Sequence, residues 1–529
     1  MKTQSTHTLR LLAPLALVAC IAGMTPAIAD DDDDKYEVWL SDQTNSKGIS
    51  ALADTGTHGG FLRIYKSDDL EQKPPVNNPL NLDAADLFSN ALASTGSQVI
   101  RLHGMLPSPN HNYMNVNFVT SGHLGIVDAR TKIAVALFRT TGTSTGRQNH
   151  MSFWSPDGNY LMVANQNGRM LERINITWDA SGENIVSAVL DAAASLDMVG
   201  GVGRITAQPV ADPSLPIGSV SGRVPDGQST TTPNGTPKQA AGIRPNNTVI
   251  CPIASSNGRH VFVSLGGGGM FVVDYTVTPM QIVGEYDRVQ QRAAGCGGVE
   301  GAGYVHLNTG TPGPNISEFS VYRFRPQDFP AAPGFNPPNT PAPIVVYADP
   351  DNGLIIPGND RDAHGMGITK PMGHRPQFLH QFDRIRNVVE TFNAATLARA
   401  TYSLTTTNGK LDGPAGTVCG TTPGAIASND PTPDLLDISP QGNRFYTALR
   451  GPFPLTVTHA ALGSCPGLGV VGIRGGGSRG ALDYVLPTTW LNFAGTRNLS
   501  DPHGAAVRMI RDSDEDDDGD DEDDQDDEG

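Results

Sequence analysis

The sequence predicts an all-β protein, a seven-bladed β-propeller closed by pairing of its N- and C-terminal strands. Three observations predict this fold. A strand–turn–strand pattern recurs along the chain with a constant spacing, which is typical of repeat architectures. The composition, with 60 Gly, 40 Pro and 17% charged residues in 529, is that of short strands joined by many turns. The two ends of the chain supply complementary parts of one repeat.

The first residues indicate export. Lys2 and Arg10 precede an apolar run over 11–24, and Ala27-Ile28-Ala29 offers a small-residue cleavage site. We therefore expect a signal peptide over 1–29 and a mature protein that is periplasmic or extracellular. The run is shorter than the roughly 20 residues that span a bilayer, so no transmembrane segment is expected. The alternative is a lipoprotein signal, in which Cys20 carries a lipid anchor.

Acidic runs flank the expected propeller. Residues 30–35 are predicted to be an acidic spacer and 512–529 a disordered acidic tail, because like charges repel one another. The propeller itself is predicted over 36–511, with an insertion at about 190–248 that is rich in Gly, Pro, Ser and Thr. A net charge of −17 argues against nucleic acid as a partner, since phosphate binding uses clustered Lys and Arg.

The clearest repeat units share a step of five residues from an opening strand to a serine in the following turn. They run from His103, His150, Cys251 and Asp434 to Ser108, Ser155, Ser256 and Ser439. The serine precedes a second strand in each unit. Because this offset recurs, we expect the same strand–turn–strand unit at each place.

Weaker units complete the ring. One opens at His364 and another covers 299–324, while 501–509 supplies an opening strand with no later strand. At the other end, 36–42 and 60–65 supply later strands with no opening strand. Joining the two ends closes the ring, in which each short sheet is covered by its neighbours. A β-sandwich is the alternative fold.

Two features resemble known propeller families. The turn Ser155-Pro156-Asp157-Gly158 and the strands 261–265 and 270–274 resemble the YVTN-type repeats of secreted bacterial propellers. The His-Gly dipeptides at 103, 364 and 503 are similar to those of nitrous-oxide reductase and of selenium-binding proteins of the methanethiol oxidase type. The resemblance covers most of the chain and implies the architecture, since a fold does not determine a function.

The opening strands of a propeller line its central channel, so equivalent residues should converge there. These residues are His103, His150, His364 and His503, with Cys251, Asp434 and a residue near Cys296 or Glu300. Neutral imidazoles that converge from several strands suit a transition metal, and copper is the first choice, with zinc and iron open.

Other polar residues have weaker claims. Asp362 and Asp501 each precede a channel histidine by two residues and would orient its imidazole. Weaker ligand candidates are His306, His374 and His380.

Three functions remain open. The first is an exported propeller whose metal polarises or oxidises a small substrate at an open coordination position. The second is a non-catalytic scaffold whose rim loops bind a protein or polymer, in which each imidazole simply bonds a carbonyl of the neighbouring blade. The third is a propeller hydrolase or lactonase.

Four cysteines follow the predicted signal peptide, and outside the cytoplasm they allow two disulfides in three connectivities. We prefer Cys419 with Cys465, and Cys251 with Cys296.

Overall fold

The computed structural model describes residues 35–44, 59–143, 145–198, 215–217, 248–292, 296–310, 313, 315–332, 340–358, 360–371, 373, 375–405, 419, 429–454, 458–492 and 494–511. The predicted signal peptide, the acidic tail, residues 30–34 of the spacer and most of the insertion lie outside these residues. Among the described residues, no helix has the length and apolar character needed to cross a membrane.

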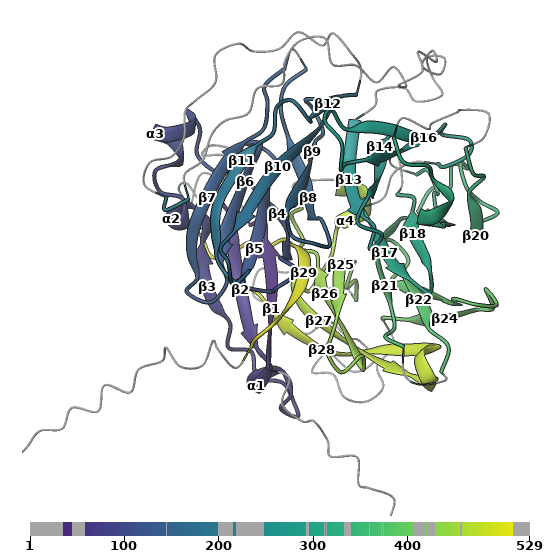
Figure 1. Cartoon of the computed structure of the whole chain (residues 1–529). Coiled ribbons are helices and arrows are strands. Elements are labelled where there is room, and N and C mark those ends of the chain that lie inside the picture. Colours follow the sequence, from purple (N-terminus) through teal and green to yellow (C-terminus); the bar gives the residue numbers. More distant parts are fainter. Residues whose placement is uncertain are drawn as a thin grey trace, which may run out of the picture. The chain divides into compact units, whose positions relative to one another are not determined.

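The predicted seven-bladed propeller is confirmed (Figure 1). Seven antiparallel sheets follow one another, and each runs from an inner to an outer strand. Blade 1 contains β29 (Pro502–Met509), β1 (Tyr36–Asp42), β2 (Phe61–Lys66) and β3 (Leu80–Asp83). Blade 2 contains β4 (Leu102–Pro107), β5 (Tyr113–Phe118), β6 (His123–Asp128) and β7 (Ile133–Arg139). Blade 3 contains β8 (Asn149–Trp154), β9 (Tyr160–Asn165), β10 (Met170–Trp178) and β11 (Ile185–Leu190), with β12 (Leu196–Asp197) also paired to β10.

The remaining blades have the same plan. Blade 4 contains β13 (Thr248–Ala254), β14 (His260–Gly266), β15 (Met270–Asp274) and β16 (Gln281–Tyr286). Blade 5 contains β17 (Gly298–Gly301), β18 (Tyr304–Asn308), β19 (Ser320–Phe324) and β20 (Ile344–Ala348). Blade 6 contains β21 (Ala363–Ile368), β22 (Phe378–Asp383), β23 (Val388–Asn393) and β24 (Arg399–Ser403). Blade 7 contains β25 (Pro433–Ile438), β26 (Arg444–Leu449), β27 (Gly467–Arg474) and β28 (Arg479–Pro487).

The helices are short and lie in connections. In the described part of the chain they are α1 (Ser67–Leu70), α2 (Ala84–Leu87), α3 (Ala91–Thr95), α4 (Thr458–Ala461) and the 3-10 turns Pro326–Asp328 and Gly475–Gly477.

Ring closure joins the two ends of the chain. The yellow β29 lies beside the purple β1 (Figure 1), and the two strands pair antiparallel with Trp39 opposite Ala506. The pairing continues through β1 to β2, where Trp39 faces Ile64. Trp39 and Ala506 are buried in one apolar cluster with residues of blade 2, so the closing pair is also part of the core.

The turns that begin with a serine form because the serine hydroxyl accepts a hydrogen bond from a backbone amide on the far side of the turn. In blade 3, Ser155 Oγ accepts from the Tyr160 amide at 2.9 Å, and Gly158 takes the left-handed φ of 71° that the turn needs. The equivalent serine in blade 4 is Ser255, whose amide bonds the carbonyl of His260. Ser256 is one residue further on, so the expected register in this blade is wrong by one residue.

A β-bulge in the inner strand aims side chains into the channel. The register of β8 shifts between Asn149 and Ser152, and the register of β21 shifts between Ala363 and Met366. The same irregularity recurs in β4, β13, β25 and β29, where His503 is the residue without a partner in the ladder. A bulge leaves residues without a partner in the ladder and turns them out of the sheet. The bulged positions hold the residues that the sequence places at the channel, except that Ile250 takes the place equivalent to His150 in blade 4.

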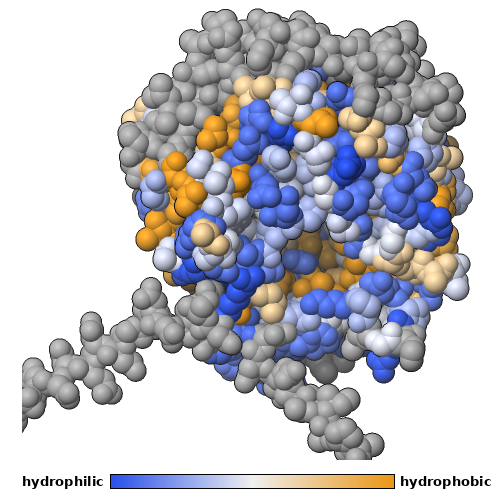
Figure 2. Space-filling model, in the orientation of Figure 1, coloured by the Kyte–Doolittle hydropathy of each residue, from blue (hydrophilic) through white to orange (hydrophobic). Residues whose placement is uncertain are grey.

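Two disulfides add covalent links, with the preferred partners. Cys251 in β13 is joined to Cys296, which lies just before β17, so this bond connects blades 4 and 5. The other bond joins Cys419 to Cys465. Figure 2 shows one face of the molecule, which is mostly hydrophilic and is hollowed near its middle.

Candidate metal centre

The four channel histidines lie in one cluster. The His103 ring stacks on the His503 ring with centroids 3.7 Å apart, and the His150 ring meets the edge of His103 at 4.5 Å. His364 meets His503 in a T-shaped contact at 5.7 Å. These residues come from the inner strands of blades 1, 2, 3 and 6, so the tertiary structure brings together side chains that are distant in the sequence.

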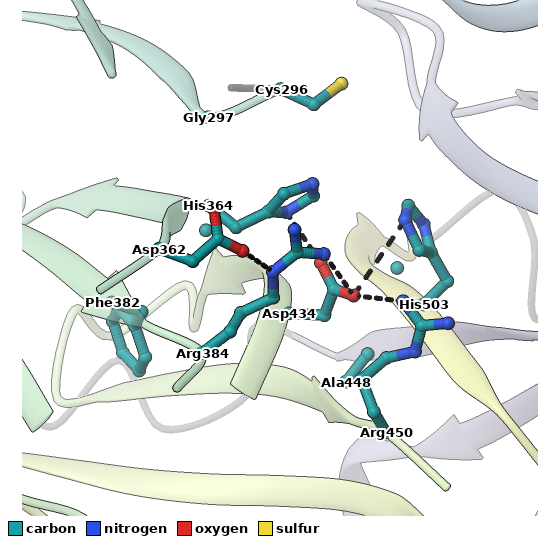
Figure 3. A network of polar contacts seen from close by, with 12 residues as sticks. Cys296, Gly297, Asp362, His364, Phe382, Arg384, Asp434, Ala448, Arg450 and His503 are labelled. Carbon is teal, nitrogen blue, oxygen red and sulfur yellow. Dashed lines mark hydrogen bonds and ion pairs between the residues drawn. The ribbon is translucent and has the colours of Figure 1, made fainter. Parts of the chain in front are cut away.

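Asp434 lies between two of these histidines (Figure 3). His364 Nδ1 is 2.6 Å from Asp434 Oδ1, and His503 Nε2 is 3.9 Å from Asp434 Oδ2. One ligand atom from each of the three residues lies within 4.8 Å of the other two. All three residues are buried, and Asp434 is 0% exposed.

Two arginines hold the second oxygen of Asp434. Arg450 Nη1 donates to Oδ2 at 2.6 Å, and Arg384 Nη1 lies 3.4 Å from the same atom. The two carboxylates expected to orient histidines hold these arginines. Asp501 accepts from Arg450, and Asp362 accepts from Arg384 (Figure 3). The carboxylate beside the imidazoles is therefore Asp434, with its Oδ1 directed at His364.

The tautomers of the stacked histidines differ. His503 Nδ1 donates to the backbone carbonyl of His103 at 2.8 Å, so a neutral His503 carries its lone pair on Nε2, facing Asp434. The Gln43 amide nitrogen donates to His103 Nδ1 at 2.6 Å, so a neutral His103 carries its proton on Nε2. His503 can thus ligate a cation through Nε2, whereas His103 presents an N–H there.

Burial keeps the imidazoles of His103, His150 and His503 neutral. Desolvation lowers the pKa of His150 to about 3, although its hydrogen bond to the backbone of Ile250 acts in the opposite direction. Burial also lowers the pKa of His103 and of His503 well below 6.5, and the nearby histidines add to the effect. The pKa of Asp434 lies well below its usual range: burial raises it, but the adjacent histidines and arginines lower it more.

Two facing atoms at the centre of the cluster lack a satisfied hydrogen bond. His364 Nδ1 and Asp434 Oδ1 are buried, and neither has a partner in hydrogen-bond geometry among the described residues, in spite of their close approach. His103 Nε2, which carries a proton, also has no hydrogen-bond partner among the described residues. Buried polar atoms are normally paired, so converging unsatisfied ligand atoms indicate a place for a bound cation or water.

The other predicted residues lie apart from this centre. Cys251 is bonded to Cys296, whose sulfur is 3.9 Å from His150 Nδ1. Glu300 is directed at the turn of blade 4, where its carboxylate accepts from Ser256 Oγ at 2.7 Å.

The weaker histidine candidates also lie elsewhere. His380 Nε2 donates to the carbonyl of Gly477, and His306 packs against Tyr304. His374 is outside the described residues.

Sequence reasoning missed the residues that hold the site in place. Gln43, Arg384 and Arg450 each directly follow the second strand of a blade. Strand pairing places this position beside the bulge of the inner strand. Aligning the repeats on the end of the second strand, as well as on the opening strand, would have found all three.

Comparisons with known proteins find similarity only to the folds of solved structures. No family model and no curated protein matches this chain. A solved putative 6-phosphogluconolactonase from Bacteroides fragilis is 9% identical with a TM-score of 0.45, over 90% of this chain and 99% of that chain. The periplasmic gluconolactonase of Pseudomonas aeruginosa is 14% identical with a TM-score of 0.40, over 86% of this chain and 98% of that chain. Hydrazine synthase from Kuenenia stuttgartiensis is 11% identical with a TM-score of 0.35, over 70% and 76%. Likeness at this level carries no statement about function, and the assignment of the chain as a seven-bladed β-propeller rests on its own strand topology.

Proposed function

We propose that this propeller binds a transition-metal ion in its channel through His364, Asp434 and His503. The observation that supports the proposal is the close approach of His364 Nδ1 and Asp434 Oδ1, 2.6 Å apart, buried and without hydrogen-bond geometry. His503 Nε2 completes the set from a third blade. Ligands held by separate blades converge without any local motif, which accounts for the absence of a recognisable metal-binding sequence.

The donor set favours a borderline metal. Two imidazoles and one carboxylate suit copper, zinc, iron or nickel, and copper(II) forms the strongest complexes with such ligands. Arg450 and Arg384 engage Oδ2 of Asp434 and leave Oδ1 for the ion. An ion with three protein ligands keeps a coordination position for water or a small substrate, whose bond it would polarise or oxidise. We take the protein to act outside the cytoplasm, with which its two disulfides are compatible.

Hydrolysis of a lactone is the second candidate function. It is the activity named for two of the solved propellers above, and one observation in this chain favours it. His364 Nδ1 and Asp434 Oδ1 are 2.6 Å apart, so a small rotation of the ring into hydrogen-bond geometry would make a carboxylate-oriented general base, whose Nε2 atom would take a proton from water. If the protein binds no metal ion and hydrolyses no lactone, the remaining candidate function is a non-catalytic binding scaffold.

Elemental analysis by mass spectrometry tests the metal proposal. The untagged, exported chain is purified without chelator and compared with His364→Ala and His503→Gln, which leave the Arg450–Asp434 pair intact. His306→Gln is the control, because His306 is an equally buried imidazole outside the channel. We expect near-stoichiometric copper or another transition metal in the wild type and in the control, and at least a tenfold loss of affinity in the channel variants.

Three results would contradict or redirect the proposal. The proposal is contradicted if the wild type remains metal-free after dialysis against copper, zinc and iron salts. It is also contradicted if the His364→Ala and His503→Gln variants bind as much metal as the wild type. Lactone hydrolysis that resists chelator but is lost in His364→Ala would favour the second candidate.

A further inference from the structure

A second set of potential ligands lies in the channel beside the first. His150, Cys251 and Cys296 come from blade 3, blade 4 and the start of blade 5, and their ligand atoms lie within 4.8 Å of one another. The Cys296 sulfur is 3.9 Å from His150 Nδ1. None of these residues belongs to the His364–Asp434–His503 centre, and Figure 3 shows Cys296 apart from Asp434.

The two sulfurs are joined in a disulfide, which changes what this set can bind. A disulfide carries no charge and is a poor ligand, whereas two thiolates and an imidazole are a strong set for zinc or copper(I). The same atoms therefore form either a covalent link between blades 4 and 5 or most of a metal site, but they do not form both at once.

We propose that reduction of the Cys251–Cys296 disulfide by a dithiol opens a second, thiolate-rich metal site with His150 as the third ligand. The dithiol supplies two electrons and two protons, is itself oxidised to a disulfide, and converts the Cys251–Cys296 bond to two thiols. A divalent cation then replaces the two thiol protons, which pass to solvent. The occupancy of the site thus follows the redox state of the channel.

The backbone geometry is compatible with both states. The Cα atoms of Cys251 and Cys296 are 5.4 Å apart. Two thiolates on one tetrahedral zinc, with bonds of about 2.3 Å, are separated by roughly 3.8 Å, which cysteines at this Cα spacing reach by side-chain rotation. His150 is half-buried, whereas the other three channel histidines are buried.

The other disulfide provides a matched control. Cys419 and Cys465 are buried and their Cα atoms are 5.3 Å apart, almost the spacing of the channel pair. Among the described residues they belong to no comparable group of metal ligands. Reduction of this bond should therefore release thiols without creating a three-ligand site.

Cadmium(II) is the probe, because thiolate-to-cadmium charge transfer reports sulfur ligation directly. The full chain is treated anaerobically with a dithiol under non-denaturing conditions, desalted, and titrated with Cd²⁺ beside the untreated chain. We expect one additional equivalent of tightly bound Cd²⁺ with the charge-transfer band only after reduction. The Cys419→Ser, Cys465→Ser double variant should keep this gain, and the Cys251→Ser, Cys296→Ser double variant should lose it. His150→Ala should weaken binding at least tenfold while the count of free thiols stays the same.

Several outcomes would overturn the inference. One is a charge-transfer band that persists without Cys251 and Cys296, and another is free thiols that form no cadmium complex. The inference would also be overturned if the dithiol failed to reduce the Cys251–Cys296 disulfide in the folded protein. The metal proposal for His364, Asp434 and His503 stands or falls separately, because it is measured in the untreated, oxidised chain and its variants leave both sulfurs in place.

Discussion

Asp434 shows how a single carboxylate can be retained at 0% exposure in the middle of a protein. Burying an isolated charge costs several kcal/mol, and partners must offset that cost. Arg450 supplies one such partner at 2.6 Å and is in turn held by Asp501, so the charges alternate along a buried chain. The consequence for function is a carboxylate that stays ionised and fixed in orientation beside His364 and His503.

The neutral histidines predict a loss of stability in mild acid. The pKa of His150 is about 3 in the folded protein against an ordinary value of 6.5, so below pH 6.5 the unfolded chain binds a proton that the folded chain does not. At pH 5 this single group reduces the free energy of unfolding by about 2 kcal/mol, and His103 and His503 act in the same direction.

Urea denaturation at pH 7, 6 and 5 measures this effect. The free energy of unfolding should fall steadily with pH, and His150→Gln should show a visibly shallower fall than the wild type. Equal slopes in the two proteins would mean that His150 is protonated with little penalty in the folded state.

At the scale of the strand, the bulge and its glycine set the distance between blades. Gly365 follows His364 in β21, and a Cβ atom at this position would lie 2.1 Å from the carbonyl oxygen of Asp434 in β25. The neighbouring atom belongs to the backbone, so it cannot move aside as a side chain would. The His-Gly dipeptide thus has a steric reason: only a hydrogen in place of Cβ allows the two inner strands to bring His364 up to Asp434.

Gly365→Ala should therefore separate blades 6 and 7. Overpacking of this kind costs about 1–3 kcal/mol, and we also expect weaker metal binding because His364 moves away from Asp434. Gly313→Ala is the control, since its nearest atom is the end of the Ile316 side chain at 3.8 Å. Urea denaturation and metal titration of the two variants make the comparison. An alanine at 365 that changes neither property would show that the strands have more freedom than the packing indicates.

At the scale of the whole molecule, the ring depends on one pairing between the ends of the chain. β29 lies between β1 and the axis, pairs with β1 along its length, and contacts the inner strands β4 and β25 of the adjacent blades. Its loss would remove His503 and leave β1 as an unpaired edge against the channel.

Truncation separates the contribution of β29 from that of the acidic residues after it. A chain that ends at Arg511 should melt cooperatively within a few degrees of the full chain. A chain that ends at Ser500 should lose the cooperative transition, because the neighbouring inner strands lose their packing partner. Differential scanning calorimetry of the two chains measures this, and equal melting of both would show that the ring is stable while open.

Much of this architecture was predictable because it is encoded locally. The serine turns, the short strands and the split repeat at 36–65 and 501–509 are signals within one or two strands, and they specify the blades and the closure of the ring. The convergence of His103, His150, His364 and His503 also followed from the repeat, since symmetry brings equivalent positions to one axis. The error in blade 4, where Ser255 begins the turn, arose because two consecutive serines make the register ambiguous in the sequence.

The sequence by itself determined the all-β fold, the closing strand pair and the convergence of His103, His150, His364 and His503, because each depends on local pattern and repetition. Only the tertiary structure decided which of those residues act together. It placed His364 and His503 on either side of Asp434. It paired Asp362 with Arg384 and Asp501 with Arg450. It also brought the Gln43 amide into hydrogen-bond contact with His103. These choices depend on distances of a few ångströms between blades that are far apart along the chain, and no pattern within one blade contains that information.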